Sequence, residues 1–335
     1  MAESKEQALS SLSEILNIDR ELARYYLERM RWSLEGAINE YYSDTADKPA
    51  GKVSNDKPPS YSQIEGEPSS PSTNASDGPQ SLKLLCWNLD GLDTVDLEER
   101  TTAVVENILL LKPDVVLLQE VVAYSLKIFQ ENCEGYIVLA GNHTVPYFNA
   151  ILIRTSTVQT KATSLKIVPF ETSIMGRHYL IHPIKFADAK IVVMTSHLES
   201  LVDNGAERKK QFSEILDYMK RQNENFNVIF GGDTNLRDTE VNAVGGVPSG
   251  ILDAWASCGS ALITKYTWNM AENNNNGKAY QRPPKLRFDR IFVRPAKEAK
   301  AIKPSTFSLV GKERLKGCKR FASDHWAIWL EFSIQ

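Results

Sequence analysis

Five apolar, strand-like segments of this sequence each carry polar or ionisable residues at one end. These residues are Asn88, Glu120, His197, Asp233 with Asn235, and Asp324 with His325. Ligands of α/β proteins collect where strand ends meet, so side chains far apart along the chain can share one site. One polar residue at a strand end means little, because loops are polar. Five such ends within residues 88–325 predict a single assembled site.

The types of residue in this set favour hydrolysis of a phosphoester. Glu120 follows a hydrophobic segment and offers the hard oxygen atoms that Mg²⁺ prefers, and Mg²⁺ often takes only one or two protein carboxylates beside water and phosphate. Asp233 and Asn235 are two residues apart, so they share a face of an extended segment. There the carboxylate could accept a proton from water while the amide orients that water or the phosphate.

Histidine and arginine residues in the same part of the chain suit the charge of a phosphate. His197 and His325 could stabilise charge on its non-bridging oxygens, and Arg177 and Arg237 could bind it as bidentate forks. Asp289 could orient a histidine through one ring nitrogen and so fix its tautomer. Together these parts predict metal-assisted phosphoester hydrolysis.

Each of these residues also has a plain structural interpretation. Glu120 or Asp233 alone is typical of a helix cap or a surface carboxylate, and Asp324 alone is typical of a cap or turn. Trp268 fits a packed core aromatic as well as a surface that stacks on a substrate. Only the joint arrangement favours a site, and His143, His178 and His182 are expected to be structural.

An alternation of strands and helices must position these side chains. Apolar runs predict strands, and apolar residues at a 3.6-residue period predict helices. Strands are predicted at 82–87, 114–119, 151–154, 179–186, 190–195, 227–230, 288–293 and 326–332, and helices at 97–111, 124–132 and 206–222. This mixture requires a layered α/β architecture.

The first 80 residues have a different character. Residues 1–43 carry three short helical stripes of apolar residues, which can form only a very small core. Residues 44–80 are rich in Pro, Gly and Ser and have only two large aliphatic side chains, so they predict a disordered linker. Within it, Pro58-Pro-Ser-Tyr61 matches the PPxY ligand of WW domains, although a motif of four residues arises readily by chance.

Composition places the chain among ordinary globular proteins. Of its 335 residues 42% are hydrophobic and 24% are charged, which excludes collagen, a coiled-coil rod and wholesale disorder. No segment approaches the roughly 20 apolar residues that span a bilayer, and no apolar leader follows Met1, so no membrane partner is expected. The four cysteines are widely spaced without a CxxC pair, which argues against a disulfide scaffold or a zinc–cysteine site.

Charge is distributed unevenly along the chain. The net charge is −3, yet residues 278–320 hold 14 Lys and Arg against 3 Asp and Glu. A basic segment in an acidic chain suggests an anionic partner such as nucleic acid or a phosphorylated ligand. The alternative is a solvated surface charged by chance, since counting along the chain says nothing about clustering in space.

Six short motifs in order resemble the endonuclease/exonuclease/phosphatase superfamily. They are Trp87-Asn88, Gln119-Glu120, Thr195-Ser-His-Leu-Glu199, Gly232-Asp-Thr-Asn235, Arg287-Phe-Asp-Arg290 and Ser323-Asp-His325. The resemblance implies an α/β fold in which two stacked mixed β-sheets are flanked by helices, a four-layer sandwich spanning residues 81–335. The segment Trp32-Ser-Leu-Glu-Gly-Ala-Ile-Asn-Glu-Tyr41 resembles the third helix of ubiquitin-associated (UBA) domains, which implies that residues 1–43 bind ubiquitin.

The superfamily resemblance also implies roles for individual residues. Glu120 would bind Mg²⁺, with Mn²⁺ as a substitute, and Asn88 and Asp324 would complete the metal site. The implied catalytic residues, which activate water and contact the phosphate, are Asp233, Asn235, His325, His197 and Asn88. Arg177, Ser200, Arg237 and Trp268 match positions that shape the phosphate and DNA-end pocket, and the tract 273–276 resembles a variable loop beside Trp268.

Within the superfamily, the particular residues of these motifs imply a particular substrate. We expect hydrolysis of the phosphotyrosyl bond between a DNA 5′ end and trapped topoisomerase II, which leaves a 5′-phosphate during double-strand break repair. The implied partners are DNA 5′ ends bearing tyrosyl or topoisomerase II peptide adducts and also 5′-tyrosyl RNA, in the nucleus and the cytoplasm. The alternatives are another nuclease or phosphatase of the same fold, or a ubiquitin-dependent signalling adaptor with an inert catalytic fold.

Overall fold

We describe a computed structural model of the chain. The structure describes residues 5–6, 8–10, 12–13, 20–29, 32, 37, 81–143, 145–277 and 280–335. The predicted linker 44–80 and most of the predicted helices in 1–43 lie outside these residues. Among the described N-terminal residues, helix α2 (Arg20–Arg29) contributes to a small buried apolar cluster with Leu9, Leu12 and Ala37.

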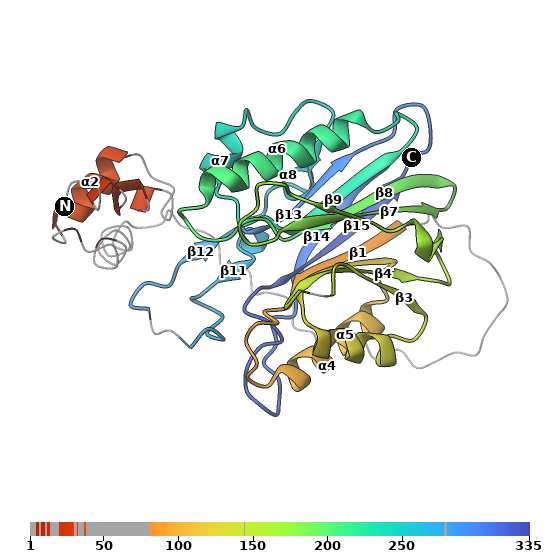
Figure 1. Cartoon of the computed structure of the whole chain (residues 1–335), viewed down its shortest axis with the longest axis horizontal. Coiled ribbons are helices and arrows are strands. Elements are labelled where there is room, and N and C mark those ends of the chain that lie inside the picture. The colour runs from red at the N-terminus through yellow and green to blue at the C-terminus, as the bar shows by residue number, and fades with distance from the viewer. Residues whose placement is uncertain are drawn as a thin grey trace, which may run out of the picture.

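Two mixed sheets form the centre of the remainder (Figure 1). The first sheet has the order β14 (Ile302–Val310), β15 (Ala327–Ile334), β1 (Ser81–Asn88), β2 (Val115–Val121), β4 (Phe148–Arg154) and β3 (Tyr136–Ala140). The second has the order β10 (Leu252–Asp253), β13 (Asp289–Arg294), β9 (Asn227–Asp233), β8 (Ala189–Ser196), β7 (His178–Phe186) and β5 (Gln159–Thr160), with β6 (Lys166–Pro169) also paired to β7. A separate ribbon pairs β11 (Trp268–Asn269) with β12 (Lys285–Leu286).

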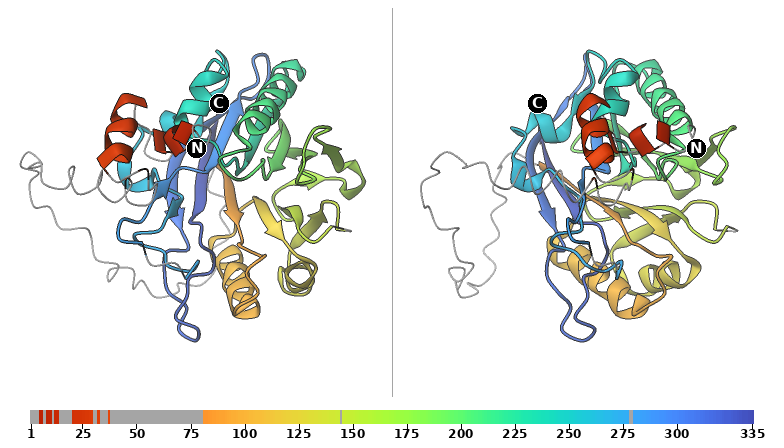
Figure 2. Two further views of the ribbon diagram at one scale, coloured as in Figure 1. Left: turned by 60° about the vertical axis from the view of Figure 1, so that its left-hand side comes forward. Right: turned by 90° about the vertical axis from the view of Figure 1, so that its left-hand side faces the viewer.

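Helices cover the outer face of each sheet (Figure 2). Helices α4 (Leu97–Leu111) and α5 (Ala123–Asn132) pack on the first sheet, and α6 (Gly205–Arg221) packs on the second. The shorter helices are α7 (Asp238–Ala243), α8 (Ala254–Ser257), η1 (Ala162–Ser164) and η2 (Leu262–Thr264). The order helix, sheet, sheet, helix confirms the predicted four-layer sandwich.

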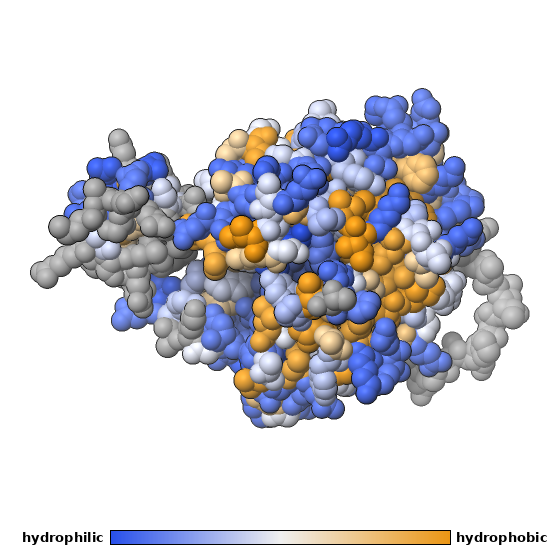
Figure 3. All heavy atoms as spheres, viewed as in Figure 1, coloured by the Kyte–Doolittle hydropathy of each residue, from blue (hydrophilic) through white to orange (hydrophobic). Residues whose placement is uncertain are grey.

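Three buried apolar clusters hold these layers together. One lies between the sheets and takes residues from both, such as Leu84, Leu117, Val193 and Ile291. The other two lie between a sheet and its helices, because strands buried on both faces need apolar residues in both directions. Hydrophilic side chains dominate the surface along α6, whereas hydrophobic ones reach the surface toward the middle of the same view (Figure 3).

Each sheet contains one parallel pair of strands, and these pairs position the site. Strands β1 and β2 are parallel and are connected through α4, while β8 and β9 are parallel and are connected through α6. A parallel connection needs such a crossover, and it places the carboxyl ends of both strands at one edge. In the part of the chain that the structure describes, no helix has the length and apolar character needed to cross a membrane.

Candidate active site

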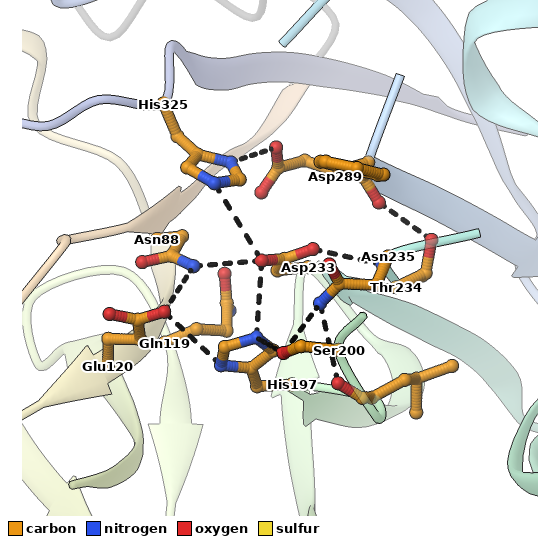
Figure 4. A network of polar contacts seen from close by, with 12 residues as sticks. Asn88, Gln119, Glu120, His197, Ser200, Asp233, Thr234, Asn235, Asp289 and His325 are labelled. Carbon is orange, nitrogen blue, oxygen red and sulfur yellow. Dashed lines mark hydrogen bonds and ion pairs between the residues drawn. The ribbon is translucent and has the colours of Figure 1, made fainter. Parts of the chain in front are cut away.

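Strand ends from both sheets meet at one place. Asn88 ends β1, Glu120 lies near the end of β2, His197 follows β8 and Asp233 ends β9. Because β1 contacts β9 across the sandwich, the carboxyl ends of the two parallel pairs face each other. Figure 4 shows these side chains pointing toward one another from different strands.

Asp233 is the centre of the polar network. The residue is 2% exposed, and its Oδ2 accepts a hydrogen bond of 2.8 Å from Asn88 Nδ2. The same Asn88 amide donates to Glu120 Oε1 at 3.2 Å, so Asn88 connects the two carboxylates. Asp233 Oδ1 accepts the backbone N–H of Asn235 at 3.0 Å, which holds the carboxylate from its other side.

Glu120 is directed into the site by an irregular strand end. Its φ is +53°, a value that is uncommon for a residue with a side chain, and the pairing of β2 with β4 shifts register between Leu118 and Val121. Such irregularities re-aim side chains beside active sites. A Cβ on Gly91 would lie 2.0 Å from the Glu120 carbonyl oxygen, so only glycine permits this approach.

His197 is held as a neutral imidazole between the carboxylates. Its Nε2 lies 3.3 Å from Asp233 Oδ2, and its Nδ1 lies 3.7 Å from Glu120 Oε1. Burial, reinforced by the nearby positive charge of Arg177, lowers the pKa of His197 to about 3. Within the described part of the chain, the buried Nδ1 atom has no hydrogen-bond partner, which leaves it free to contact a ligand.

His325 has the opposite protonation state. Its Nδ1 lies 2.7 Å from Asp289 Oδ2, and its Nε2 is directed toward Asp233 Oδ2 at 3.8 Å. Burial alone would lower the pKa of His325, but the facing carboxylates of Asp289, Asp324 and Asp233 raise it well above its ordinary value. Asp289 is opposite Asp233 in the β13–β9 pairing, so the backbone register places this orienting carboxylate behind the ring.

The ionisation of Asp233 follows from these neighbours. Burial acts to raise its pKa, but His197 and His325 together with the hydrogen bonds from Asn88 and Asn235 lower it below its ordinary value. Asp233 is therefore a carboxylate that can accept a proton at neutral pH. It is flanked by one neutral and one cationic imidazole.

Ser200 joins the predicted phosphate-binding residues on one side of the site. Arg177 Nη2 donates to Ser200 Oγ at 2.8 Å, and the Arg177 guanidinium lies 5.1 Å from the centre of the Tyr147 ring. Asn235, with φ +50°, directs its Nδ2 to Ser200 Oγ at 3.5 Å. Arg237 lies behind Asn235, because its Nη1 donates to the Asn235 carbonyl at 2.8 Å. One nitrogen of the expected Arg237 fork is thus engaged by the protein itself.

Trp268 lies on the opposite side of the site. Its indole Nε1 donates to Asp324 Oδ2 at 3.0 Å, and its backbone forms a β-bridge with His325. Its ring also packs against Phe288, with ring centres 5.6 Å apart. The ring of Trp268 therefore packs internally in part, and the residue is only half-buried beside the site. Stacking on a substrate stays a prediction.

Carboxylates crowd the space between Glu120 and Asp324. Burial and the negative charge of Asp324 raise the pKa of Glu120 to about 7 and that of Asp90 to about 8. Mutual repulsion of this kind is relieved by a cation. Across the described residues, no three His, Cys, Asp or Glu side chains are disposed to hold a metal ion by themselves. Any metal here would draw its other ligands from water, amides or substrate.

Sequence reasoning missed several residues that build the site. Gln119 Nε2 donates to Thr195 Oγ1 at 2.9 Å between the two sheets, and Ser323 Oγ donates to the Asn88 carbonyl at 2.6 Å. The Arg177 guanidinium lies over the ring of Tyr147. Gln119, Thr195 and Ser323 stand within the quoted motifs, but nothing in the sequence shows which partners they bond, and Tyr147 belongs to no motif.

The tract 273–276, expected to be a variable loop beside Trp268, connects β11 to β12 and is partly buried. Asn273 and Asn275 are buried and hydrogen-bonded to the segment that precedes His325. A run of four asparagines is polar along the chain, but alternate members point inward, where backbone groups satisfy their amides.

Three arginines of the basic segment 278–320 are buried inside the fold. Arg287 pairs with Asp253, Arg290 with Asp238, and both arginines are buried. Arg294 is also buried and donates to backbone carbonyls. Part of the segment's positive charge is therefore buried within the fold, which a count along the chain cannot reveal.

Two family models match the chain. One, described as the Endonuclease/Exonuclease/phosphatase family, matches residues 85–325, and the other, described as a UBA-like domain, matches residues 6–48. Among similar proteins, tyrosyl-DNA phosphodiesterase 2 of Xenopus laevis is 34% identical over 100% of this chain and 95% of its own length. The human protein of that name is 34% identical over 96% of this chain and 91% of its own length.

Solved structures show the same likeness. The crystal structure described as D. rerio TDP2 complexed with single strand DNA product has a TM-score of 0.72 and 39% identity, covering 76% of this chain and 99% of that chain. The structure of TDP2 from C. elegans has a TM-score of 0.68 and 30% identity, covering 98% of this chain and 93% of that chain.

Proposed function

The chain belongs to the Endonuclease/Exonuclease/phosphatase family and, within it, to the tyrosyl-DNA phosphodiesterase 2 proteins, and we propose the following reaction for it. It hydrolyses the phosphotyrosyl bond that joins a DNA 5′ end to trapped topoisomerase II, and it leaves a 5′-phosphate during double-strand break repair. The observation that carries this proposal is the meeting of Asn88, Glu120, His197 and His325 around the Asp233 carboxylate.

Phosphodiesterases of this family generally depend on a divalent metal ion. The carboxylates of Glu120 and Asp324 and the amide of Asn88 offer the hard oxygen ligands of Mg²⁺, for which Mn²⁺ is a substitute. Burial and the negative charge of Asp324 raise the pKa of Glu120, as expected where a cation is to be bound. We assign the metal to these residues; when bound, it supplies positive charge to the phosphate oxygens.

Asp233 is the residue placed to activate water. It is ionised and buried, and no lysine or arginine pairs with it among the described contacts. Its carboxylate accepts a proton from the attacking water, and the adjacent Asn235 amide orients that water or the phosphate. The hydrogen bond from Asn88 keeps the carboxylate directed into the site.

The histidines and Arg177 stabilise the charge that grows on phosphate oxygens. His325 is cationic and donates from Nε2, while neutral His197 donates or accepts according to its tautomer. Arg177 and Ser200 lie beside His197, and Ser200 Oγ is 3.5 Å from its Nε2. Donors positioned in a buried site need no reorganisation during the reaction, which is why they lower its barrier.

The substrate makes modest demands on acid catalysis. A tyrosyl diester releases a phenolate, and the pKa of the phenol is about 10, so the leaving group needs less protonation than an alkoxide. Trp268, half-buried beside Asp324, is placed to stack on the terminal nucleotide, a contact worth about 1–3 kcal/mol per base. The same chemistry would accommodate 5′-tyrosyl RNA.

Further partners follow from the N-terminal region. The UBA-like match supports ubiquitin binding by this part of the chain, which would bring the enzyme to ubiquitin-bearing adducts. We propose that the protein acts in the nucleus and also in the cytoplasm, where its DNA and RNA substrates arise.

A panel of three substrates with Mg²⁺ tests the proposed reaction. We expect turnover of a 5′-tyrosyl oligonucleotide to a 5′-phosphate, and little turnover of an abasic duplex or an inositol polyphosphate. Chelation with EDTA should abolish the activity, and added Mg²⁺ should restore it. Turnover of only the abasic duplex or the inositol polyphosphate would show that this site serves another phosphoester.

The His325–Asp289 pair predicts a shift in pH dependence. The Asp289 carboxylate raises the pKa of His325, so in Asp289→Asn burial is opposed only by Asp324 and Asp233 and that pKa falls. The cationic imidazole is then lost at lower pH. We expect the basic limb of the kcat profile to move to lower pH and kcat at neutral pH to fall by about 10²-fold. Profiles of both proteins measure this, and an unmoved basic limb would exclude a cationic role for His325.

A further inference from the structure

Alternate members of the asparagine tract 273–276 point in opposite directions. The tract lies between β11, which carries Trp268, and β12. Asn273 is 0% exposed and Asn275 is 7% exposed, whereas Asn274 lies on the surface. The Asn274 side chain accepts a hydrogen bond from the exposed Arg314 guanidinium, at 3.0 Å. The tract therefore has a buried side and a solvent side built from one residue type.

The buried side of the tract is hydrogen-bonded to the segment that precedes His325. Asn275 Nδ2 donates to the Phe321 carbonyl at 2.8 Å, and the Phe321 N–H donates to Asn275 Oδ1 at 2.9 Å. Asn273 Nδ2 donates to the Ser323 carbonyl at 2.8 Å, and its Oδ1 accepts the backbone N–H of Asn275 at 3.0 Å. The side-chain amides of Asn273 and Asn275 thus form hydrogen bonds with the backbone of residues 321 and 323, as a neighbouring strand would. These bonds satisfy backbone groups that are buried.

Ser323 connects this segment to the active-site residues Asn88 and His325. It is fully buried, and its Oγ accepts the backbone N–H of His325 at 3.0 Å while donating to the Asn88 carbonyl at 2.6 Å. Asn88 in turn bonds Asp233. The tract is therefore two hydrogen bonds away from both Asn88 and His325.

We propose that Asn273 and Asn275 are positioning residues that set the location of the Asp324–His325 turn. This inference rests on the proposed phosphodiesterase function, because it assigns the tract to the same reaction. The alternative is that the tract forms one wall of the DNA-binding pocket and contacts only the DNA. The two roles differ in which kinetic constant they change: a positioning residue changes kcat on any substrate, whereas a DNA wall changes KM on substrates long enough to reach it.

The test compares Asn275→Ala with Asn274→Ala as a matched control from the same tract. Each is assayed on a 5′-tyrosyl oligonucleotide and on thymidine 5′-(p-nitrophenyl) phosphate, a diester too short to span the tract. For Asn275→Ala we expect kcat to fall about tenfold or more on both substrates with little change in KM, since small misplacements of catalytic groups cost this much. Asn274→Ala should match the unsubstituted chain.

Hydrogen exchange separates positioning from loss of folding. Amides in residues 321–325 should exchange faster in Asn275→Ala, while amides of β9 and β15 keep their protection. Asn273→Ala, which removes the bond to the Ser323 carbonyl and the one accepted from the Asn275 N–H, should give the same pattern if Asn275→Ala folds poorly. Unchanged kcat on the small diester, a rise confined to KM on DNA, or faster exchange throughout the sandwich would each overturn the proposal. If the unsubstituted chain turns over neither substrate, the proposed function fails, and the exchange experiment still decides whether the tract holds this turn.

Discussion

Asp233→Asn is expected to reduce kcat on a 5′-tyrosyl oligonucleotide by about 10³-fold or more, equivalent to about 4 kcal/mol of transition-state stabilisation. Asparagine keeps the size of the side chain but cannot take a proton from water. It also removes the negative charge that faces His197 and His325. KM should change little or fall, because an anionic substrate then meets one less negative charge. Steady-state kinetics at saturating Mg²⁺ measure both constants.

Asp217→Asn is the matched control for this change. Asp217 lies on α6, is exposed, and pairs only with Lys220 three residues on among the contacts of the described chain. A surface pair of this kind contributes little to stability, so activity should be unaffected. If Asp233→Asn retained more than about a tenth of the original kcat while folded, Asp233 would not be the residue that activates water.

Glu120→Gln should cause a loss of similar size that depends on the metal concentration. The amide is a neutral and weaker ligand than a carboxylate, so the apparent affinity for Mg²⁺ should fall and kcat should drop by about 10²–10³-fold at ordinary Mg²⁺. Because the irregular end of β2 and the contact with Gly91 involve backbone atoms, the fold should be preserved. Activity titrated with Mg²⁺ and Mn²⁺ measures the shift.

Glu131→Gln on α5 provides the comparison, since its exposed carboxylate pairs with Lys127 on the same helix. That variant should have the same metal dependence as the unsubstituted chain. A Glu120→Gln protein with an unchanged Mg²⁺ titration would move the metal to other ligands and would contradict the assignment of Glu120.

The order and type of the long elements were predictable because their burial is periodic. Helices 97–111 and 206–222 and the long apolar strands carry the pattern of residues that pack against the sheets. Strands β3 and β14 were not predicted. Both lie at edges of the first sheet and are only partly buried, so their alternation is weak. The short strands β10, β11 and β12 have two residues each, too few for any period.

The composition of the site was predictable to a greater extent than its geometry. Polar residues at the ends of buried strands are visible in sequence, and Asn88, Glu120, His197 and Asp233 do meet. The bulge that turns Glu120 inward and the register that places Asp289 opposite Asp233 depend on strand pairing across the fold. Local sequence carries no record of such pairing.

The asparagine tract shows where sequence reasoning fails. Polar runs are typical of loops. Asn273 and Asn275 are nevertheless buried, because their amides form hydrogen bonds with backbone groups of residues 321 and 323. The charge count for residues 278–320 is misleading for the same reason, because it ignores burial. The charges were counted along the chain without regard to burial, but Arg287 and Arg290 are buried and pair with Asp253 and Asp238 from other elements.

The central claim is that one metal and one 5′-phosphate are held together by residues from both sheets. A crystal structure of the full chain with Mn²⁺ and a 5′-phosphorylated single-stranded oligonucleotide tests it most directly, because the anomalous signal locates the metal independently of the protein. We predict a Mn²⁺ peak in bonding contact with Glu120 and the phosphate between His325 and His197, facing Asp233. A metal bound away from Glu120, or a DNA 5′ end bound elsewhere on the surface, would contradict the account.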